Sequence, residues 1–407
     1  MSETQKHTKP NVPNLRFPGF TGGWESRKIG EDCSVLMCKR IFANQTSEQG
    51  DVPFYKIGTI GAEPDAFISK ELFDEYKAKY NYPRKGEVMI TCAGTVGKTI
   101  VFNGDDSYYQ DSNIVWLSNP KQLYINSFLN YYLTRVNWNK LNSTTITRIY
   151  NDNLRELVIK YPCVKEQEKI VSLLSLLDQR IAVQSKVIEK LKSLIRELNN
   201  KLMDNPLWNK VYLGDFMQFY STNSLSWEQL SYESGRMKNL HYGLIHIGLP
   251  TMTDCKDNTL PYIQAPFIPK QFTICKDGDI AFADASEDTE EVGKAIELYN
   301  TGSMDVVCGL HTIHGRDIMG LTVVGFKGFA FNSKSFHDQL RRLAQGSKVY
   351  SITAENIKNC YIYVPEVTEQ RRIVGLLLCL QDKIKCAERE LNSYEMQKQF
   401  MLREMLV

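Results

Sequence analysis

An internal repeat constrains this chain more than any other feature of its sequence. Residues 162–181 read PCVKEQEKIVSLLSLLDQRI, and residues 365–384 read PEVTEQRRIVGLLLCLQDKI. Both segments contain the pattern P-x-x-x-E-Q-x-x-I-V, and each matched position lies 203 residues from its counterpart, as from 162 to 365. A repeat of this length predicts two similar halves, each with its own core, rather than one continuous domain.

Weaker matches place the same order of motifs in both halves. WESRKIGE at 24–31 corresponds to WNKVYLGD at 208–215, and GEV at 86–88 corresponds to GDI at 278–280. Each half is therefore predicted to be a globular unit followed by a long helix. We expect a flexible tail at 1–23, a globular domain at 24–164, a helix at 165–204, a second globular domain at 205–365 and a second helix at 366–407.

Short β-branched runs alternate with turn residues inside each globular unit. EVMIT at 87–91 and IVWL at 114–117 are apolar runs separated by Gly, Pro and Asn, which is typical of strands. Helical stretches are fewer, for example at 128–136 and 336–344. We therefore predict an α+β fold for each unit.

The two long helices carry matching heptad repeats of apolar residues. Steps of four and three residues alternate along each helix, which is the pattern of a coiled-coil seam. The predicted seam residues are Ile170, Leu174, Leu177, Ile181, Ile188, Leu191, Ile195 and Leu198 in the first helix, with Ile373, Leu377, Leu380, Ile384 and Leu391 in the second.

Each of these apolar stripes needs a partner. The simplest partner is the other helix, and an antiparallel pair would relate the two globular units by a pseudo-twofold axis. A single stripe could equally pack on a globular core or on another subunit. Because the two stripes match, we prefer the coiled coil.

Composition excludes several classes of protein. No apolar run approaches the roughly 18–20 residues that cross a bilayer, and the first twenty residues lack the layout of a signal peptide. The ten cysteines are scattered and form no C-x-x-C pair, which favours reduced, buried thiols over a metal site. We expect a cytoplasmic protein with no membrane partner and no metal.

The segment CAGTVGKT at 92–99 ends like a phosphate-binding loop but departs from it. The first glycine of G-x-x-x-x-G-K-[ST] is replaced by Cys92, and the corresponding segment of the second half has Asp288 there. A strand followed by a glycine-rich turn is the better interpretation, although an enzyme that hydrolyses nucleotides through Lys98 remains an alternative. We found no methyltransferase, nuclease or Ser-His-Asp pattern, so no catalytic residue is predicted.

Local charge points to nucleic acid, although the net charge of the whole chain is only +2. Residues 121–160 and 327–361 each carry six basic and two acidic residues, mixed with aromatic and hydroxyl side chains. Such segments suit contacts with phosphates and base edges, and a solvated basic face is the alternative. The candidate DNA-binding residues are Lys140, Arg148, Tyr150, Arg341, Arg342, Lys348 and Tyr350.

Taken together, these features resemble the specificity subunits of Type I restriction-modification systems. The resemblance lies in the doubled P-x-x-x-E-Q-x-x-I with its heptad helix, and in the doubled strand-glycine motif KGEVMI at 85–90 and DGDIAF at 277–282. It also includes Gly346-Ser347 and GLHT at 309–312. The chain departs from the family where Asn142-Ser143 stands in place of the glycine-serine pair.

The resemblance implies a protein that reads DNA and performs no chemistry. Residues 24–164 and 205–365 would be target-recognition domains, each reading half of an asymmetric bipartite site, and the helices would fix the spacing. Two modification (methyltransferase) subunits would supply S-adenosylmethionine, and restriction subunits would use ATP and magnesium, so this chain itself would hold no cofactor. A coiled-coil scaffold that binds protein without DNA is the main alternative.

Overall fold

The structure is a computed structural model, and it describes residues 11–138, 148–288, 291–346 and 348–407. The chain forms two compact units. Unit 1 comprises Met1–Ser185 with Arg389–Val407, and unit 2 comprises Lys186–Glu388. Each unit therefore contains one end of each long helix, so the units are not simply the two halves of the sequence.

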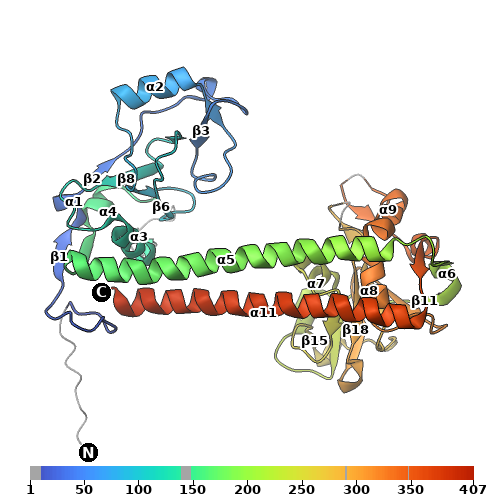
Figure 1. The fold of residues 1–407 in the computed structure, drawn as a ribbon. Coiled ribbons are helices and arrows are strands. Elements are labelled where there is room, and N and C mark those ends of the chain that lie inside the picture. The colour runs from blue at the N-terminus through green and yellow to red at the C-terminus, as the bar shows by residue number, and fades with distance from the viewer. Residues whose placement is uncertain (1–10, 139–147, 289–290, 347) are drawn as a thin grey trace, which may run out of the picture. The chain divides into compact units, whose positions relative to one another are not determined.

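Unit 1 contains small sheets with helices beside them (Figure 1). The strand orders are β2-β8-β5-β6, β4-β3-β7 and β1-β9. Its elements are β1 (Glu25–Lys28), α1 (Ile29–Asp32), β2 (Ser34–Leu36), η1 (Ala43–Gln45), β3 (Val52–Tyr55), β4 (Phe67–Ile68), α2 (Lys70–Lys79), β5 (Val88–Thr91), β6 (Thr99–Val101), β7 (Tyr108–Tyr109), β8 (Ile114–Ser118), α3 (Asn126–Arg135), α4 (Asn151–Glu156), β9 (Val158–Tyr161) and the first part of α5 (Val164–Met203).

Unit 2 repeats this order with additions. Its strand orders are β11-β20-β16-β18-β14, β12-β15-β13-β19, β10-β22 and β17-β21. Its elements are β10 (Asn209–Tyr212), α6 (Leu213–Phe216), β11 (Met217–Tyr220), η3 (Trp227–Gln229), β12 (Leu230–Ser231), β13 (Met237–Leu240), α7 (Tyr242–Ile247), β14 (Met252–Asp254), β15 (Tyr262–Ile263), η4 (Ala265–Phe267), β16 (Ile280–Ala283), β17 (Ala285–Ser286), β18 (Ala295–Tyr299), η5 (Thr301–Ser303), β19 (Asp305–Cys308), β20 (Thr312–Asp317), α8 (Phe326–Phe331), α9 (Lys334–Leu343), β21 (Tyr350–Ser351), α10 (Ala354–Lys358), β22 (Tyr361–Val364) and the first part of α11 (Val367–Met405).

The pairing of the strands is the same in the two units. β5 lies antiparallel between β6 and β8 in unit 1, as β16 lies between β18 and β20 in unit 2. β3 runs parallel to β7, as β13 runs parallel to β19. β5 and β16 are buried at every residue, which explains why their sequences are continuous apolar runs. The internal repeat thus encodes one topology twice.

The glutamine of the repeated E-Q motif anchors the start of each long helix. Gln167 is fully buried, and its Nε2 donates to the carbonyl oxygens of Leu123 and Pro162, both at 2.9 Å. Its Oε1 accepts from the backbone N–H of Ile125 at 2.8 Å. One side chain thus satisfies three backbone groups just before α3 and α5, which buried polar groups require.

Gln370 makes the equivalent three bonds in unit 2. Its Nε2 donates to the carbonyl oxygens of Leu321 at 3.1 Å and Pro365 at 2.9 Å. Its Oε1 accepts from the N–H of Val323 at 2.8 Å. A primary amide combines two N–H donors with a carbonyl acceptor, so the repeated glutamine satisfies the same three backbone groups in both units.

The long helices run antiparallel within each unit (Figure 1). In unit 1, Asp178 of α5 pairs with Lys398 of α11, and further along α5 the side chain of Gln184 bonds Glu390 at 3.0 Å. In unit 2, Lys192 pairs with Glu388 at 2.7 Å. Residue numbers rise on one helix as they fall on the other, so the predicted antiparallel direction is confirmed.

All the predicted seam residues are buried or half-buried, but the ends of the seam belong to the domain cores. Ile170 and Leu174 lie in the unit 1 core together with Leu402 and Met405 of α11. Ile373 and Leu377 lie in the unit 2 core, against Ile195 and Leu198 of α5. The seam thus continues into each unit. Eight seam residues are buried: Ile170, Leu174, Leu177, Ile188, Ile373, Leu377, Leu380 and Ile384. The other five, Ile181, Leu191, Ile195, Leu198 and Leu391, are half-buried.

Part of the segment at 1–23, which we expected to be a flexible tail, is bound to unit 1. Residues 1–10 lie outside the described residues. Within 11–23, Arg16 makes two hydrogen bonds of 2.7 Å, from Nε and from a terminal nitrogen, to the two carboxylate oxygens of Glu166. Glu166 is the glutamate of the E-Q motif and is 1% exposed. This bidentate ion pair makes the segment part of unit 1.

The predicted fold class is confirmed: two similar α+β units and two long antiparallel helices are present. The predicted helices at 128–136 and 336–344 correspond to α3 and α9, each displaced by one or two residues. Among the described residues, no helix is long and apolar enough to span a bilayer.

Candidate nucleic-acid interface

Each unit has a cleft at the carboxyl ends of its parallel strand pair. In unit 1 a cleft of about 340 Å³, here cleft A, lies between the loop after β2, the end of β3 and the loop between β7 and β8. Arg40, Phe42 and Lys56 line it together with Asp111 and Ser112. The carboxyl ends of parallel strands are where loops gather side chains from separate parts of the sequence.

Arg40 and Phe42 project from the first of these loops. The Arg40 Nε donates to Asp111 at 2.9 Å, and the Arg40 side chain stays 59% exposed. Phe42 is 58% exposed, although a large apolar ring is usually buried. A guanidinium and an exposed ring at one cleft are the residue types that contact guanine edges and thymine methyl groups in a major groove.

Unit 2 has a cleft at the equivalent edge of its fold. This cleft, here cleft B, has a volume of about 560 Å³. It is lined by the loop between β19 and β20, by α7, which follows β13, and by the segment after β16. Tyr242, His246 and His311 line it together with Asp288 and Val349. The two clefts thus occupy corresponding places but present different side chains.

Four rings form a cluster that leads into cleft B. The ring of His241 lies 4.4 Å from Trp227 and 4.8 Å from Tyr242, between centroids, and Tyr242 lies 5.1 Å from His311. Burial, followed by the nearby His311, lowers the pKa of His241, so this imidazole is neutral near pH 7. His311 Nδ1 lies 3.1 Å from a carboxylate oxygen of Asp284. The cluster offers ring faces, N–H donors and carboxylates at one surface.

Arg148, a candidate from the sequence, lies beside cleft A. Its terminal nitrogen donates to the carbonyl oxygen of Ser112, a lining residue, at 3.2 Å. The neighbouring Ile149 donates its N–H to the Cys92 carbonyl at 2.9 Å, which ties this segment to the end of β5. Half-buried and bonded to the backbone, Arg148 helps to shape the cleft as well as charging it.

Lys348 and Tyr350 lie in the corresponding segment of unit 2. Tyr350 of β21 pairs with Ser286 of β17, which lines cleft B, and Val349 between the two candidates lines it as well. Ile352 donates its N–H to the carbonyl of Asp284 at 2.8 Å, matching the bond of Ile149 in unit 1. The segment that contains these two candidates therefore borders the second cleft, although neither of the two lines it.

The other described candidates, Tyr150, Arg341 and Arg342, do not line either cleft. Tyr150 is 60% exposed and precedes α4. Arg341 and Arg342 are exposed in the last turn of α9, where Arg341 lies 3.8 Å from Asp338. Neither arginine lines cleft B. Lys140 lies outside the described residues.

Two lysines of the basic segments are held in ion pairs with buried carboxylates, and one of them, Lys327, is itself buried. Lys121 donates to Asp32 at 3.0 Å, and Tyr124 donates to the same carboxylate at 2.8 Å. Burial opposes ionisation of Asp32, but these partners outweigh it and lower its pKa. Lys327 is 2% exposed, 3.3 Å from the fully buried Glu297. The basic segments are therefore less available to phosphates than their sequences suggested.

The glycine-lysine turn at Gly97-Lys98 does not have the structure of a phosphate-binding loop. After Gly97 and Lys98 the chain continues as strand β6, whereas a phosphate loop leads into a helix. The Lys98 ammonium donates to the carbonyl oxygen of Ile60 at 2.5 Å. Gly97 has φ +82°, and a Cβ there would overlap the ring of Trp138. The glycine is required by a tight turn and a close approach of Trp138.

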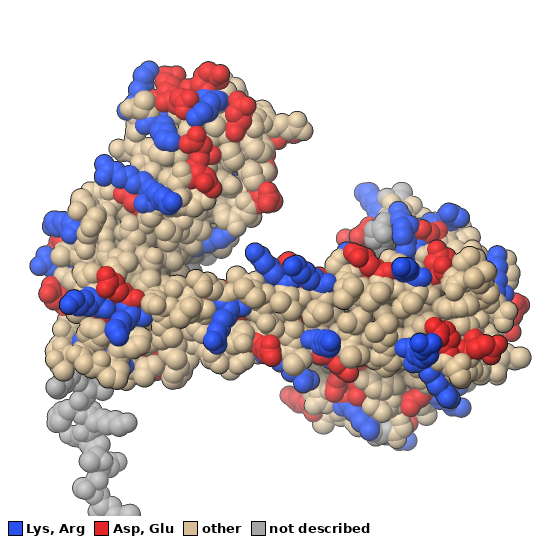
Figure 2. Space-filling model, in the orientation of Figure 1, with Lys and Arg blue, Asp and Glu red and all other residues tan. Residues whose placement is uncertain are grey.

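Charges alternate in sign over the visible surface. Figure 2 shows lysines and arginines mixed with aspartates and glutamates, without a large region of one sign on that face. The net charge of +2 agrees with this picture. The visible face therefore offers no strong electrostatic field for non-specific DNA binding, and the two clefts are the better candidates for DNA contact.

Comparison with known proteins places this fold. Residues 21–193 match the family model described as the Type I restriction modification DNA specificity domain. Over these residues the chain is similar to the Type I restriction-modification specificity family. A Haemophilus influenzae protein described as a type I restriction enzyme specificity subunit is 51% identical over 147 residues. That match covers 36% of this chain and 38% of the length of the H. influenzae protein.

Two solved structures share the fold over nearly the whole chain. The S subunit of a Type I restriction-modification system from M. genitalium superposes with a TM-score of 0.57 at 17% identity, covering 97% of this chain and 99% of that one. A chain from a type I R-M system studied for complex assembly and conformational transition gives 0.57 at 15% identity, covering 96% and 98%. At these identities the likeness establishes the fold.

Sequence reasoning missed several residues of the clefts. Arg40 and Phe42 lie outside the basic segments, and so do Trp227, Tyr242 and His311. The crowding of histidines in the second half could have pointed to cleft B. The unusual exposure of Phe42 is visible only in the structure.

Proposed function

We propose that this chain is the sequence-reading subunit of a Type I restriction-modification complex, with each unit reading half of a bipartite DNA target. The observation that carries the proposal is the pair of clefts at equivalent edges of two equivalent folds. The similarity of residues 21–193 to the Type I restriction modification DNA specificity domain supports DNA as the ligand. Clefts A and B are the proposed base-reading surfaces, with Arg148, Lys348 and Tyr350 at their margins.

An asymmetric target follows from the different chemistry of the two clefts. Cleft A presents Arg40 and Lys56, which suit acceptors such as guanine O6 and N7. Cleft B is lined by carboxylates, among them Glu287 and Asp288, which suit the amino group of cytosine and repel phosphates. Two identical half-sites would not fit two such different surfaces.

The helices α5 and α11 are proposed to set the distance between the half-sites and to bind the partner subunits. Exposed apolar side chains such as Leu176, Val183 and Met396 remain on them and suit a protein partner. The proposed partners are two modification subunits, which would bring S-adenosylmethionine, and restriction subunits, which would bring ATP and magnesium. This chain would then contribute recognition only, in the cytoplasm where the DNA lies.

Methylation mapping tests the proposal. The full chain is expressed with its modification subunits in a host that lacks other methyltransferases, and the methylated motif is read from the genome. Residues 24–161 are then replaced by the equivalent segment of a family member. We expect one half of the motif to change while the other half and the spacing stay the same.

The matched control is the exchange of residues 208–364, which should change only the other half. A change of both halves after either exchange would contradict independent recognition. If the chain with its modification subunits shifts no DNA fragment in a gel, the protein is instead a coiled-coil scaffold.

A further inference from the structure

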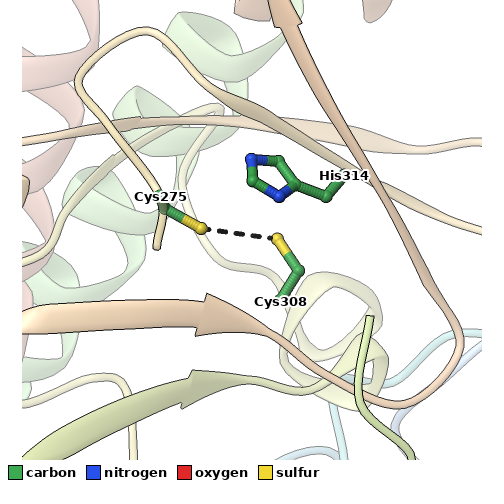
Figure 3. A group of neighbouring side chains, drawn as sticks. All are labelled: Cys275, Cys308 and His314. Carbon is green, nitrogen blue, oxygen red and sulfur yellow. Dashed lines mark hydrogen bonds between the residues drawn. The ribbon is translucent and has the colours of Figure 1, made fainter. Parts of the chain in front are cut away.

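Three side chains that are far apart in the sequence converge in the core of unit 2. Cys275 lies in the loop before β16, Cys308 ends β19, and His314 lies in β20 (Figure 3). All three are buried, and one ligand atom from each lies within 4.8 Å of the others. The two cysteines are 33 residues apart, so no spacing rule could have paired them.

The distances fit a metal ion held by sulfur. The Sγ atoms of Cys275 and Cys308 are 3.7 Å apart. Zinc–sulfur bonds are about 2.3 Å long, so two thiolates at a tetrahedral angle lie about 3.8 Å apart. A disulfide bond would bring the sulfurs to about 2.05 Å, so the two cysteines are not joined as a disulfide.

A carboxylate orients the histidine as in metal sites. His314 Nε2 lies 2.7 Å from Asp279, which also accepts hydrogen bonds of 2.8 and 2.7 Å from Arg316. With Nε2 donating to this carboxylate, Nδ1 carries the lone pair, and Figure 3 shows that ring nitrogen facing the two sulfurs. A histidine that binds a metal through one nitrogen usually gives its other N–H to a carboxylate or carbonyl.

We propose that Cys275, Cys308 and His314 bind a Zn²⁺ ion, with Asp279 and Arg316 as the supporting pair. The two thiolates balance the charge of a divalent ion, and the imidazole is neutral. The site as a whole would then be neutral, which suits its burial. Three protein donors leave one zinc position for a water molecule. The ion would join β19, β20 and the loop before β16, and so stabilise the 309–311 segment beside cleft B.

Without a metal the same residues would form only a chain of hydrogen bonds. Zinc binding must then release two protons, and the complete burial of the site requires the ion to enter during folding. This inference concerns the interior of unit 2 and does not depend on the proposed function.

The test measures metal in the full chain. Protein is produced in medium supplemented with zinc, or with cobalt, then dialysed against a mild chelator and analysed by mass spectrometry. We expect about one zinc per chain. The cobalt protein should show a thiolate-to-cobalt charge-transfer band and the intense visible bands of a tetrahedral site.

Variants assign the ligands. Cys275→Ser and Cys308→Ser should lose the bound metal, and so should H314Q. Cys255→Ser is the matched control, because Cys255 is buried in the same core cluster but lies outside the three-residue group. Circular dichroism shows which variants fold, and if none does, the cobalt spectrum of the unaltered chain still decides.

Two results would overturn the site. One is a folded wild-type chain with no metal and no cobalt spectrum. The other is metal that all variants retain equally, since it would then be bound elsewhere. Recovery of the chain with Cys275 and Cys308 joined as a disulfide counts with the first result.

Discussion

Replacing Gln167 by methionine should destabilise unit 1 by about 3 kcal/mol. Methionine keeps the length of the side chain and is as good a helix former, so the loss is confined to hydrogen bonds. The bond to the Pro162 carbonyl is fully buried, and leaving that oxygen without a partner costs roughly 1–3 kcal/mol. The bonds to Leu123 and Ile125 are partly buried, so water can replace them in part, at about 0.5–1 kcal/mol each.

Hydrogen exchange of the full chain, followed by mass spectrometry, measures this effect in each unit separately. A loss of about 3 kcal/mol raises the population of the open state roughly 150-fold. We expect the amides of α3 and of the start of α5 to exchange faster by that factor. The amides of α8 and the start of α11 should be unchanged, because Gln370 still anchors unit 2.

Two further variants sharpen the test. Glu168→Met changes the exposed neighbour in the same helical turn and should alter exchange by less than threefold. Gln370→Met should transfer the whole effect to unit 2. If Gln167→Met exchanges no faster than Glu168→Met, the three hydrogen bonds contribute little and the explanation of the repeated glutamine is wrong.

Four other perturbations have directions that follow from the structure. Gly97→Ala should cost more than 3 kcal/mol of unit 1 stability in thermal unfolding, because its Cβ would overlap Trp138, whereas Gly22→Ala, also at positive φ but with no atom within 4 Å, should cost about 1. The pKa of Asp32 is lowered in the folded state, so its ionised carboxylate contributes fully to the free energy of unfolding above the ordinary carboxyl pKa of 3.8. This contribution is lost as the pH falls further. Asp32→Asn should therefore make the stability of unit 1 depend less on pH in an acid titration. Lys348→Ala should weaken DNA binding by the complex and reduce its log–log salt slope by about 1, and an unchanged slope would exclude a phosphate contact. Adding four residues to α5 lengthens it by about 6 Å, so methylation mapping should show a spacer one base pair longer with both half-sites unchanged.

The sequence predicted the repeated architecture because repetition is visible without any contact being known. Ile149 and Ile352 lie 203 residues apart, the same offset as the repeat, and the backbone N–H of each donates to the carbonyl oxygen that follows a central strand. The heptads predicted long paired helices, since periodicity depends only on the helix itself. Periodicity could not reveal that the two ends of the seam lie inside the domain cores. An apolar residue such as Ile170 or Ile373 fits the pattern equally well whether it packs in a coiled coil or in a domain core.

The candidate site was harder to predict because the clefts are made by loops. Charge counting selected Lys121 and Lys327 along with Lys348. Only the structure shows that Lys121 and Lys327 are paired with the buried carboxylates of Asp32 and Glu297. The aromatic residues of cleft B and the cysteine–histidine group come from distant segments. Their convergence depends on strand pairing, which local sequence does not specify.

The division of the long helices between the units has a consequence for synthesis. Unit 2 is one continuous stretch, Lys186–Glu388, and can close as soon as that stretch has left the ribosome. Unit 1 begins earlier but needs Leu402, Met405 and Leu406 to complete its core. The domain made first is therefore the last to be finished. A ribosome that stops shortly after residue 388 would release a chain whose second recognition unit is whole while its first has an open, apolar core.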